Sequence, residues 1–324
     1  MRAVQCREWG GPDKLVIAEV APRDPGPGEV KIRVRAAGVN FPDVLMIQQK
    51  YQMKPELPFT PGSEVAGEVI ALGEGVDDFR PGQRVMAYCA LGGFAQEAVV
   101  AANACFAMPD ALGYEVAAAV LLAYGTSWHA LRDRAALKSG ETLLVLGAAG
   151  GVGLAAVDIG AALGARVIAA ASSDEKLSVC RRHGAHALIN YRNENLREAI
   201  ARLTERRGPD VIYDPVGGAV SEPAFRSIGW RGRHLVVGFA EGAIPSIALN
   251  LVLLKGAAIV GVFWGEHTKR ERALYRAETE AMIGSIVKGE LNPLVSRTYS
   301  LEHAPEALAD MAARKAVGKI VVTP

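Results

Sequence analysis

Three glycines in the middle of the chain could hold a phosphate group. They lie in the segment Gly-Ala-Ala-Gly-Gly-Val-Gly over residues 147–153, between an apolar run at Leu143–Leu146 and a helical pattern. Glycine at Gly147, Gly150 and Gly153 permits a tight turn, close approach of the backbone to a pyrophosphate, and close packing of helix on strand. The N-terminus of the following helix also favours an anion. Although Ala148 makes the motif a variant, the pattern predicts a dinucleotide site, with a structural turn as the alternative.

The end of the next expected strand indicates which dinucleotide binds. The strand over Arg166–Ala171 runs into Ser172 and Ser173, with no acidic residue before the following helix. An acid at this place holds the ribose 2′-hydroxyl of NAD, whereas hydroxyls and cations hold a 2′-phosphate. The candidates for that contact are Ser172, Lys176, Tyr191 and Arg192. We therefore expect NADPH to be preferred, unless these charges are only solvated surface groups.

Alternating strands and helices surround these residues. Strands are expected over Leu143–Leu146, Arg166–Ala171, His186–Asn190, Asp210–Tyr213, Leu235–Val237 and Ala258–Phe263. Helices are expected near residues 152–163 and from Asp174, where Ser173 can cap the N-terminus. Continuous apolar strands separated by helices predict a parallel sheet covered on both faces.

The two ends of the chain have a different pattern of expected elements, with short strands and turns in place of regularly alternating strands and helices. Val30–Val34 alternates apolar and charged residues, and Glu64–Leu72 and Gln83–Tyr88 are further strands between Pro-Gly turns. The tail is expected to form a charged helix from Thr268 towards Lys288, a helix over Pro305–Arg314 and a strand over Lys319–Val322. We expect a β-rich domain formed by residues 1–122 and 266–324, interrupted by an α/β domain at 123–265.

The composition of the chain argues against several classes of protein. The 324 residues are 50% hydrophobic and 22% charged, with a formal net charge of +1, so no nucleic-acid partner is expected. The four cysteines are scattered and form no CxxC pair, and no segment is typical of a signal peptide or a membrane span. A cytoplasmic location without membrane association is expected.

Several motifs together resemble one family. They are Ala37–Asp43 (AGVNFPD), Pro61–Gly67 (PGSEVAG), Gly73–Val76 (GEGV), Pro81–Val85 (PGQRV), the glycine segment, Val211–Gly218 (VIYDPVGG) and Gly318–Val321 (GKIV). The ordered set resembles the zinc-free quinone oxidoreductase (zeta-crystallin-like) group of the medium-chain dehydrogenase/reductase superfamily. The resemblance implies a Rossmann-type doubly wound parallel sheet inserted in a GroES-like β-rich catalytic domain.

The resemblance also implies that no metal takes part. Zinc-dependent relatives carry a cysteine and a histidine where this chain has Asn40 and Ser63. An amide and a hydroxyl are poor zinc ligands beside a thiolate and an imidazole. None of the six histidines lies at metal-ligand spacing with a cysteine. We expect no bound zinc.

Site residues follow from the resemblance one at a time. Asn40 matches a polar residue lining the nicotinamide and substrate cleft, and Tyr51 an aromatic over that cleft. The backbone of Gly150, Gly151 and Val152 should hold the pyrophosphate. The matching cofactor contacts elsewhere are Thr126, Gly238, Phe239, Phe263 and Arg314, with Lys319 as a second candidate for the cofactor phosphate. Leu45 replaces a cleft tyrosine found in some members, so substrate contacts do not transfer as a set.

A metal-free site suits hydride transfer from NADPH to a quinone. The proton could come from Tyr51, from Asp43 through water, or from solvent. The alternatives are an enoyl-thioester or alkenal reductase of the same superfamily and, in another class, an NADPH-binding crystallin-like or RNA-binding protein. A homodimer is expected, because the strand near Ala258–Phe263 would otherwise leave an apolar sheet edge open.

Overall fold

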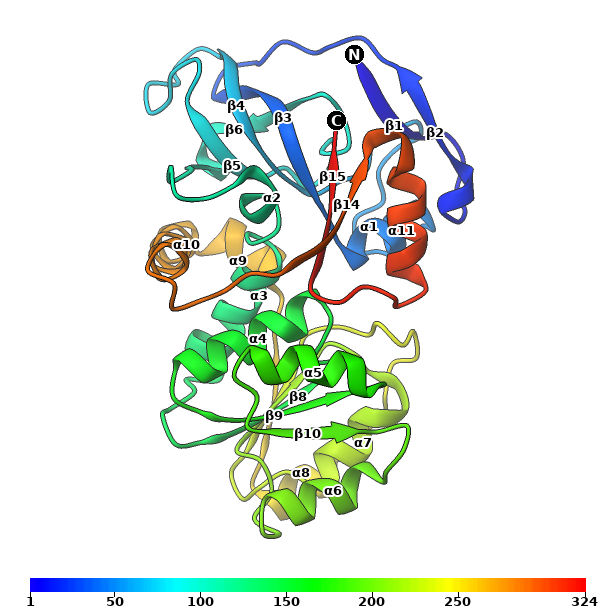
Figure 1. Cartoon of the computed structure of the whole chain (residues 1–324), viewed down its shortest axis with the longest axis vertical. Coiled ribbons are helices and arrows are strands. Elements are labelled where there is room, and N and C mark those ends of the chain that lie inside the picture. Colours follow the sequence, from blue (N-terminus) through cyan, green and yellow to red (C-terminus); the bar gives the residue numbers. More distant parts are fainter. The chain divides into compact units, whose positions relative to one another are not determined.

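The chain folds into two compact units. The computed structural model describes all 324 residues, and one unit combines Met1–Leu122 with Pro293–Pro324 while the other is Ala123–Asn292 (Figure 1). The segment 266–292, which we expected in the catalytic domain, belongs to the second unit. The reason is its long helix, which packs against helix α3 (Ala123–Trp128) of that unit. No helix combines the length and the apolar character needed to cross a bilayer.

The unit Ala123–Asn292 is built on a parallel sheet. Its strands, in spatial order, are β10 (Ala187–Asn190), β9 (Arg166–Ala171), β8 (Thr142–Leu146), β11 (Val211–Asp214), β12 (Arg233–Val236) and β13 (Ala258–Gly261). Every neighbouring pair is parallel, as the continuous apolar strands predicted. The helices between them are α4 (Gly151–Ala162), α5 (Asp174–Arg182), α6 (Leu196–Leu203), α7 (Gly218–Arg226) and α8 (Leu249–Lys255).

Alternate residues of each strand pack on opposite faces of this sheet. Leu144 and Leu146 of β8 lie in a buried cluster with Ile200 of α6 and Phe225 of α7. Leu143 faces α4, because a Cβ on Gly160 of that helix would lie 2.6 Å from its Cδ2 atom. Both faces of the sheet are therefore covered, which is the doubly wound arrangement that the sequence predicted.

The charged segment expected as one helix from Thr268 is two helices. Helix α9 spans Trp264–Arg270 and α10 spans Arg272–Val287, with Glu271 between them at φ −121° and ψ 47°. The Glu271 carboxylate bonds Nδ1 of His267 at 2.6 Å. This contact links the residue at the break to the last turn of α9. Helical periodicity alone did not reveal it, because both halves have the same charged composition.

The other unit is built on a mostly antiparallel sheet. Its strands run in the order β14 (Val295–Ser300), β15 (Lys319–Thr323), β3 (Glu29–Val39), β4 (Glu64–Leu72), β5 (Arg84–Tyr88) and β7 (Cys105–Ala107), and β6 (Glu97–Ala101) also pairs with β3. Strands β1 (Arg2–Cys6) and β2 (Leu15–Glu19) form a separate ladder. The remaining helices of this unit are α1 (Phe41–Ile47), α2 (Tyr114–Ala117) and α11 (Ala304–Ala312).

Strand β15 joins the end of the chain to its beginning. It pairs antiparallel with β3, with Ile320 opposite Val39 and Val322 opposite Ala37, and it pairs in parallel with β14. Its residues Ile320, Val321 and Val322 are fully buried. The register places Lys319 next to the carboxyl end of β3, where Asn40 follows.

Candidate active site

The glycine segment forms a tight turn between β8 and α4. Gly147 has φ +58°, a conformation that side chains other than glycine rarely adopt. A Cβ on Gly153 would lie 2.3 Å from the carbonyl oxygen of Gly147, so only glycine lets the helix approach the turn this closely. Gly150 is the N-cap of α4, and no side chain caps the helix. The partly exposed backbone of Gly150, Gly151 and Val152 therefore presents N–H groups at a positive helix end, which fits a pyrophosphate.

This turn lies where the strand order of the sheet reverses. The chain runs from β8 outward through β9 to β10, then returns to β11 on the other side of β8. Loops after β8 and β11 meet at this point, since a Cβ on Gly147 would lie 2.7 Å from Cγ2 of Val216. In open α/β sheets, ligands bind at this reversal, beyond the carboxyl ends of the strands.

The segment after β11 is held by a buried carboxylate. Asp214 accepts hydrogen bonds from the backbone N–H groups of Val216 and Gly217, both at 2.9 Å, and from the hydroxyl of Ser221. His234 of β12 lies 3.2 Å from the same carboxylate. Burial alone would raise the pKa of Asp214, but these hydrogen bonds lower it overall. Asp214 therefore fixes the loop that faces the glycine turn.

Other predicted cofactor residues lie beyond the same edge of the sheet. Ser172 follows β9, Tyr191 follows β10, Gly238 and Phe239 follow β12, and Phe263 follows β13. Because all these strands are parallel, their carboxyl ends lie together. Phe239 is 38% exposed and Phe263 is 54% exposed, which is unusual for large apolar side chains. The structure thus brings this part of the predicted set to one edge.

Ser173 and Lys176 lie at the first turn of α5. The hydroxyl of Ser173 accepts a hydrogen bond from the backbone N–H of Lys176 at 3.4 Å, so the predicted N-cap is confirmed. Ser172, one residue earlier, is partly exposed. No carboxylate occupies the end of β9 itself. A contact between these residues and a 2′-phosphate stays a prediction.

Thr126 lies in α3, a helix tied to the glycine turn. It is 8% exposed, and the neighbouring Ser127 donates a hydrogen bond to the carbonyl of Val152 at 2.8 Å. Ser127 also bonds the hydroxyl of Tyr213 at 2.8 Å. These bonds hold α3 against the start of α4 and against β11. Ser127 could not be predicted from the sequence, because a hydroxyl beside the motif threonine is typical of an ordinary helix residue.

In the other unit, Asn40 and Asp43 form a capping box at the start of α1. The backbone N–H of Asn40 donates to Oδ2 of Asp43 at 2.8 Å, and Oδ1 of Asp43 accepts from the hydroxyl of Ser63 at 3.1 Å. Asp43 is fully buried, and this burial raises its pKa to about 7. The structure therefore places the Asp43 carboxyl group, with a pKa near 7, beside Asn40 and close enough to Tyr51 for its charge to act on that phenol.

A buried lysine is bonded into the same group. Nζ of Lys319 donates to Oε1 of Glu64 at 2.8 Å, to the carbonyl of Val39 at 3.1 Å and to Oδ1 of Asn40. The amide of Asn40 donates to Glu64 at 2.9 Å. We call Asn40, Asp43, Ser63, Glu64 and Lys319 the polar network.

The polar network corrects one prediction. Lys319 is 3% exposed and its ammonium group already has three acceptors, so it is not available to bind a cofactor phosphate. The place of Lys319 follows from the pairing of β15 with β3, which sets it beside Asn40 and which the sequence alone does not show. The partner, Glu64, was missed because the sequence shows it only as the first residue of the expected strand Glu64–Leu72.

The donor groups of the polar network do not fit zinc. Asn40 and Ser63 offer an amide and a hydroxyl 3.4 Å apart, and the positive charge beside them is the ammonium group of Lys319. A cation held here would be repelled by Lys319 and would lack thiolate and imidazole ligands.

Tyr51 and Arg314 belong to the same unit as the polar network. Tyr51 is partly exposed, and burial together with the charge of Asp43 raises the pKa of its phenol. The phenol therefore stays protonated at neutral pH. Arg314 follows α11, is exposed and has φ +57°. Because the glycine turn belongs to the other unit, the proposed contact of Arg314 with the cofactor stays a prediction.

Comparison with known proteins agrees with this architecture. Residues 26–110 match the family described as alcohol dehydrogenase GroES-like domain, and residues 151–279 match the one described as zinc-binding dehydrogenase. The quinone oxidoreductase-like protein 2 homolog of Nematostella vectensis is 39% identical over 99% of this chain and 88% of its own length. The chain belongs to the quinone oxidoreductase family. These matches place it in the quinone oxidoreductase group of the medium-chain dehydrogenase/reductase superfamily.

Other members of the family match along their whole length. The quinone oxidoreductase of Pseudomonas aeruginosa is 35% identical over 100% of this chain and 99% of its own. The crystal structure of Escherichia coli quinone oxidoreductase complexed with NADPH superposes with a TM-score of 0.93, at 28% identity, over the full length of both chains. The GroES-like and Rossmann-type folds expected from the sequence are thus confirmed.

Proposed function

We propose that this quinone oxidoreductase family member is an NADPH-dependent reductase that transfers hydride to a quinone-type acceptor without a catalytic metal. The observation that carries the proposal is the polar network, in which Asn40 and Ser63, the residues that replace the zinc ligands of zinc-dependent relatives, lie 3.4 Å apart beside the ammonium group of Lys319. Full-length relatives named quinone oxidoreductase, and a structural neighbour solved with NADPH, support the same activity. The rival is reduction of an activated C=C bond, as in an enoyl thioester or alkenal.

Bound NADPH supplies the hydride, and the chain supplies binding and orientation. The turn at Gly150 and Gly151 binds the pyrophosphate through backbone N–H groups. Ser172, Lys176 and Tyr191 bind the 2′-phosphate through hydroxyl and ammonium groups. Without a Lewis acid, the acceptor must be electron-poor enough to take hydride directly.

Two groups can supply the proton that a reduced quinone needs. Asp43 has a pKa near 7, so it is partly protonated at neutral pH, and it is bonded to Ser63 rather than to solvent. Tyr51 stays protonated, because burial and the charge of Asp43 raise its pKa. A hydroquinone anion is a weak base, so solvent is an adequate third source.

The proposal is tested by assaying NADPH oxidation after treatment with a strong chelator, using a panel of small quinones, enones and enoyl-CoA thioesters. We expect activity with a quinone to survive the chelator unchanged. Activity that disappears with the chelator while the thermal midpoint stays unchanged, and that returns with added zinc, would overturn the mechanism without a catalytic metal.

We further propose that two copies of the chain pair through the unit Ala123–Asn292. Strand β13 pairs only with β12, so its other edge is open, and Ile259 on it is 41% exposed. Helix α8 buries no residue, and both Leu249 and Leu253 are 79% exposed. An open apolar edge is normally paired or covered, and a two-fold axis lets one strand pair with its own copy. A second copy of β13 and α8 is therefore the occupant we propose.

A cytoplasmic location is also a proposal. It is supported by the four cysteines, none of which forms a disulfide and three of which are buried.

A further inference from the structure

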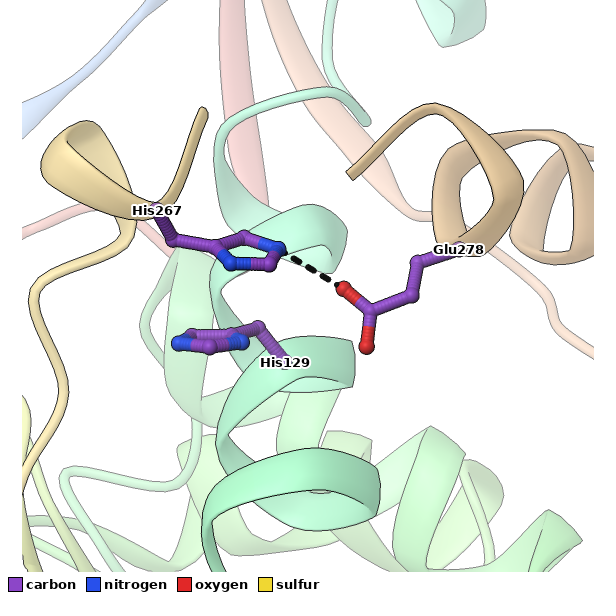
Figure 2. Close-up of side chains that lie close together, drawn as sticks. All are labelled: His129, His267 and Glu278. Carbon is purple, nitrogen blue, oxygen red and sulfur yellow. Dashed lines mark hydrogen bonds and ion pairs between the residues drawn. The ribbon is translucent and has the colours of Figure 1, made fainter. Parts of the chain in front are cut away.

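Two histidines and a glutamate form a cluster that quinone reduction does not use. His129 begins a π-helical segment (His129–Arg134) after α3, His267 lies in α9, and Glu278 lies in α10. Their side chains converge from three separate elements of one unit (Figure 2). One nitrogen or oxygen atom of each lies within 4.8 Å of the others, and both histidines are 4% exposed. A buried group of titratable side chains with a shifted pKa is a candidate for a functional site.

His267 has the environment of a metal-binding histidine. Its Nε2 atom lies 2.9 Å from Oε2 of Glu278, and its Nδ1 atom lies 2.6 Å from Oε2 of Glu271. A metal-bound histidine usually donates its second ring N–H to a carboxylate, which orients the ring and makes the first nitrogen more basic. Glu271 fills that role from the break between α9 and α10. Nε2 then remains for an ion that Glu278 can share.

His129 supplies a second nitrogen without a hydrogen bond. Its Nδ1 atom is buried and makes none, although Oδ2 of Asp133 lies 3.3 Å away. Burial and the neighbouring His267 lower the pKa of His129 to about 4, so the ring is neutral at pH 7. A buried polar atom without a partner needs an explanation, and a neutral imidazole nitrogen is a ligand for transition metals.

The two rings are close enough to bind one ion after a small movement. They are stacked, with centroids 3.9 Å apart and planes 16° apart (Figure 2). Ring lone pairs lie in the ring plane, so parallel rings direct them side by side. A tilt of one ring makes the two lone pairs converge towards the carboxylate of Glu278, and Asp133 or a water molecule can complete a tetrahedron.

We infer that His129, His267 and Glu278 form a binding site for a divalent transition-metal ion such as Zn²⁺, which fastens α9 and α10 to the π-helical segment after α3. Two imidazoles and one carboxylate suit zinc and its neighbours, whereas magnesium and calcium prefer oxygen ligands alone. The expectation of a metal-free chain rested on the ligand places of zinc-dependent relatives and on histidine–cysteine spacing. This cluster was not visible there, because its residues are distant in the sequence.

Zinc titration of the metal-stripped full-length chain tests the site. We compare the wild type with His267→Ala, with Glu278→Gln, and with His303→Ala, which removes an exposed histidine of the other unit. We expect one zinc ion per chain by calorimetry and a rise in the thermal midpoint, because an ion that binds only the folded state stabilises it. Affinity should fall at least about tenfold in both cluster variants and stay unchanged in His303→Ala.

Glu278→Gln keeps the size of the side chain, so its loss of affinity cannot come from a collapsed fold if its circular dichroism matches the wild type. Cobalt absorption gives a second readout, since its bands report nitrogen and oxygen ligands. Equal zinc affinity in all four proteins, or no saturable zinc binding in the wild type, would overturn the inference.

Discussion

At the scale of single residues, the polar network contains a charge pair out of reach of water. Lys319 and Glu64 have side chains 3% and 0% exposed, and their charged atoms lie 2.8 Å apart. The sequence predicted the importance of Asn40 and Asp43 through the family motif. It misassigned Lys319, because residue type alone cannot say whether an ammonium group faces phosphate or a buried carboxylate. Only the pairing of β15 with β3 decides that.

Removing the lysine should destabilise the fold strongly. Lys319→Met leaves the carboxylate of Glu64 buried without its cation, which costs about 3–5 kcal/mol. The double variant Lys319→Met/Glu64→Gln should recover part of this loss, because no buried charge then remains. Lys315→Met is the matched control, since that side chain is 64% exposed and its pair with Asp310 is worth at most about 1 kcal/mol. Urea unfolding measures all three, and equal losses in Lys319→Met and Lys315→Met would contradict the network.

Asp43 should make stability depend on pH in a defined direction. Burial raises its pKa in the folded state to about 7, so the folded protein holds this proton more tightly than the unfolded chain does. The contribution of Asp43 to the free energy of unfolding is therefore fully present at low pH and is lost as pH rises from about 4 to 7.

The variant Asp43→Asn removes this titration. The unfolding free energy of the wild type minus that of Asp43→Asn should decrease between pH 5 and pH 8, by on the order of a few kcal/mol. Asp110→Asn, at an exposed position, should show no such trend. A difference that is flat or increases with pH would mean that Asp43 is ionised throughout.

At the scale of elements, periodicity placed most strands and helices. Strands β4 and β9 begin and end at the predicted residues, because apolar runs bounded by turns define them. Strand β14 was missed, since Val295–Ser300 is mostly polar and exposed and forms a strand only by pairing with β15. The helix break at Glu271 was also missed, because the residues on both sides of it are equally typical of a helix and only the structure shows the contact of Glu271 with His267.

The start of α5 should determine the choice of dinucleotide. Losing one charge-assisted contact to the 2′-phosphate costs roughly 1.5–3 kcal/mol. Lys176→Ala should therefore raise KM for NADPH about tenfold or more and leave KM for NADH nearly unchanged. Arg182→Ala, at the other end of the same helix, serves as the control. Equal efficiency of the wild type with both dinucleotides would contradict the assignment.

At the scale of the whole molecule, the sequence predicted two folds but placed one boundary wrongly. Residues 266–292 belong to the unit Ala123–Asn292, because α10 packs against α3 of that unit. The tail after Pro293 joins the other unit through β14 and β15. A domain boundary that follows two charged helices produces no change in composition or hydrophobic periodicity by which the sequence could reveal it.

The open edge of β13 should control assembly. The wild type should have twice the chain mass by light scattering. Ile259→Lys and Leu253→Lys should shift it towards the monomer, because a buried unpaired charge opposes pairing. Leu274→Lys, at a 44% exposed position of α10, should leave the mass unchanged. A wild-type protein that is monomeric at micromolar concentration would contradict the proposed interface.

The central claim is tested most directly by comparing kcat/KM for a small quinone with kcat/KM for crotonyl-CoA, both with NADPH, in the wild type and in Tyr51→Phe. The enolate formed from an enoyl thioester is far more basic than a hydroquinone anion, so it gains more from a placed acid. We predict higher efficiency with the quinone and only a modest effect of Tyr51→Phe on it. Higher efficiency with crotonyl-CoA, abolished in Tyr51→Phe, would contradict the account and assign the site to enoyl-thioester reduction.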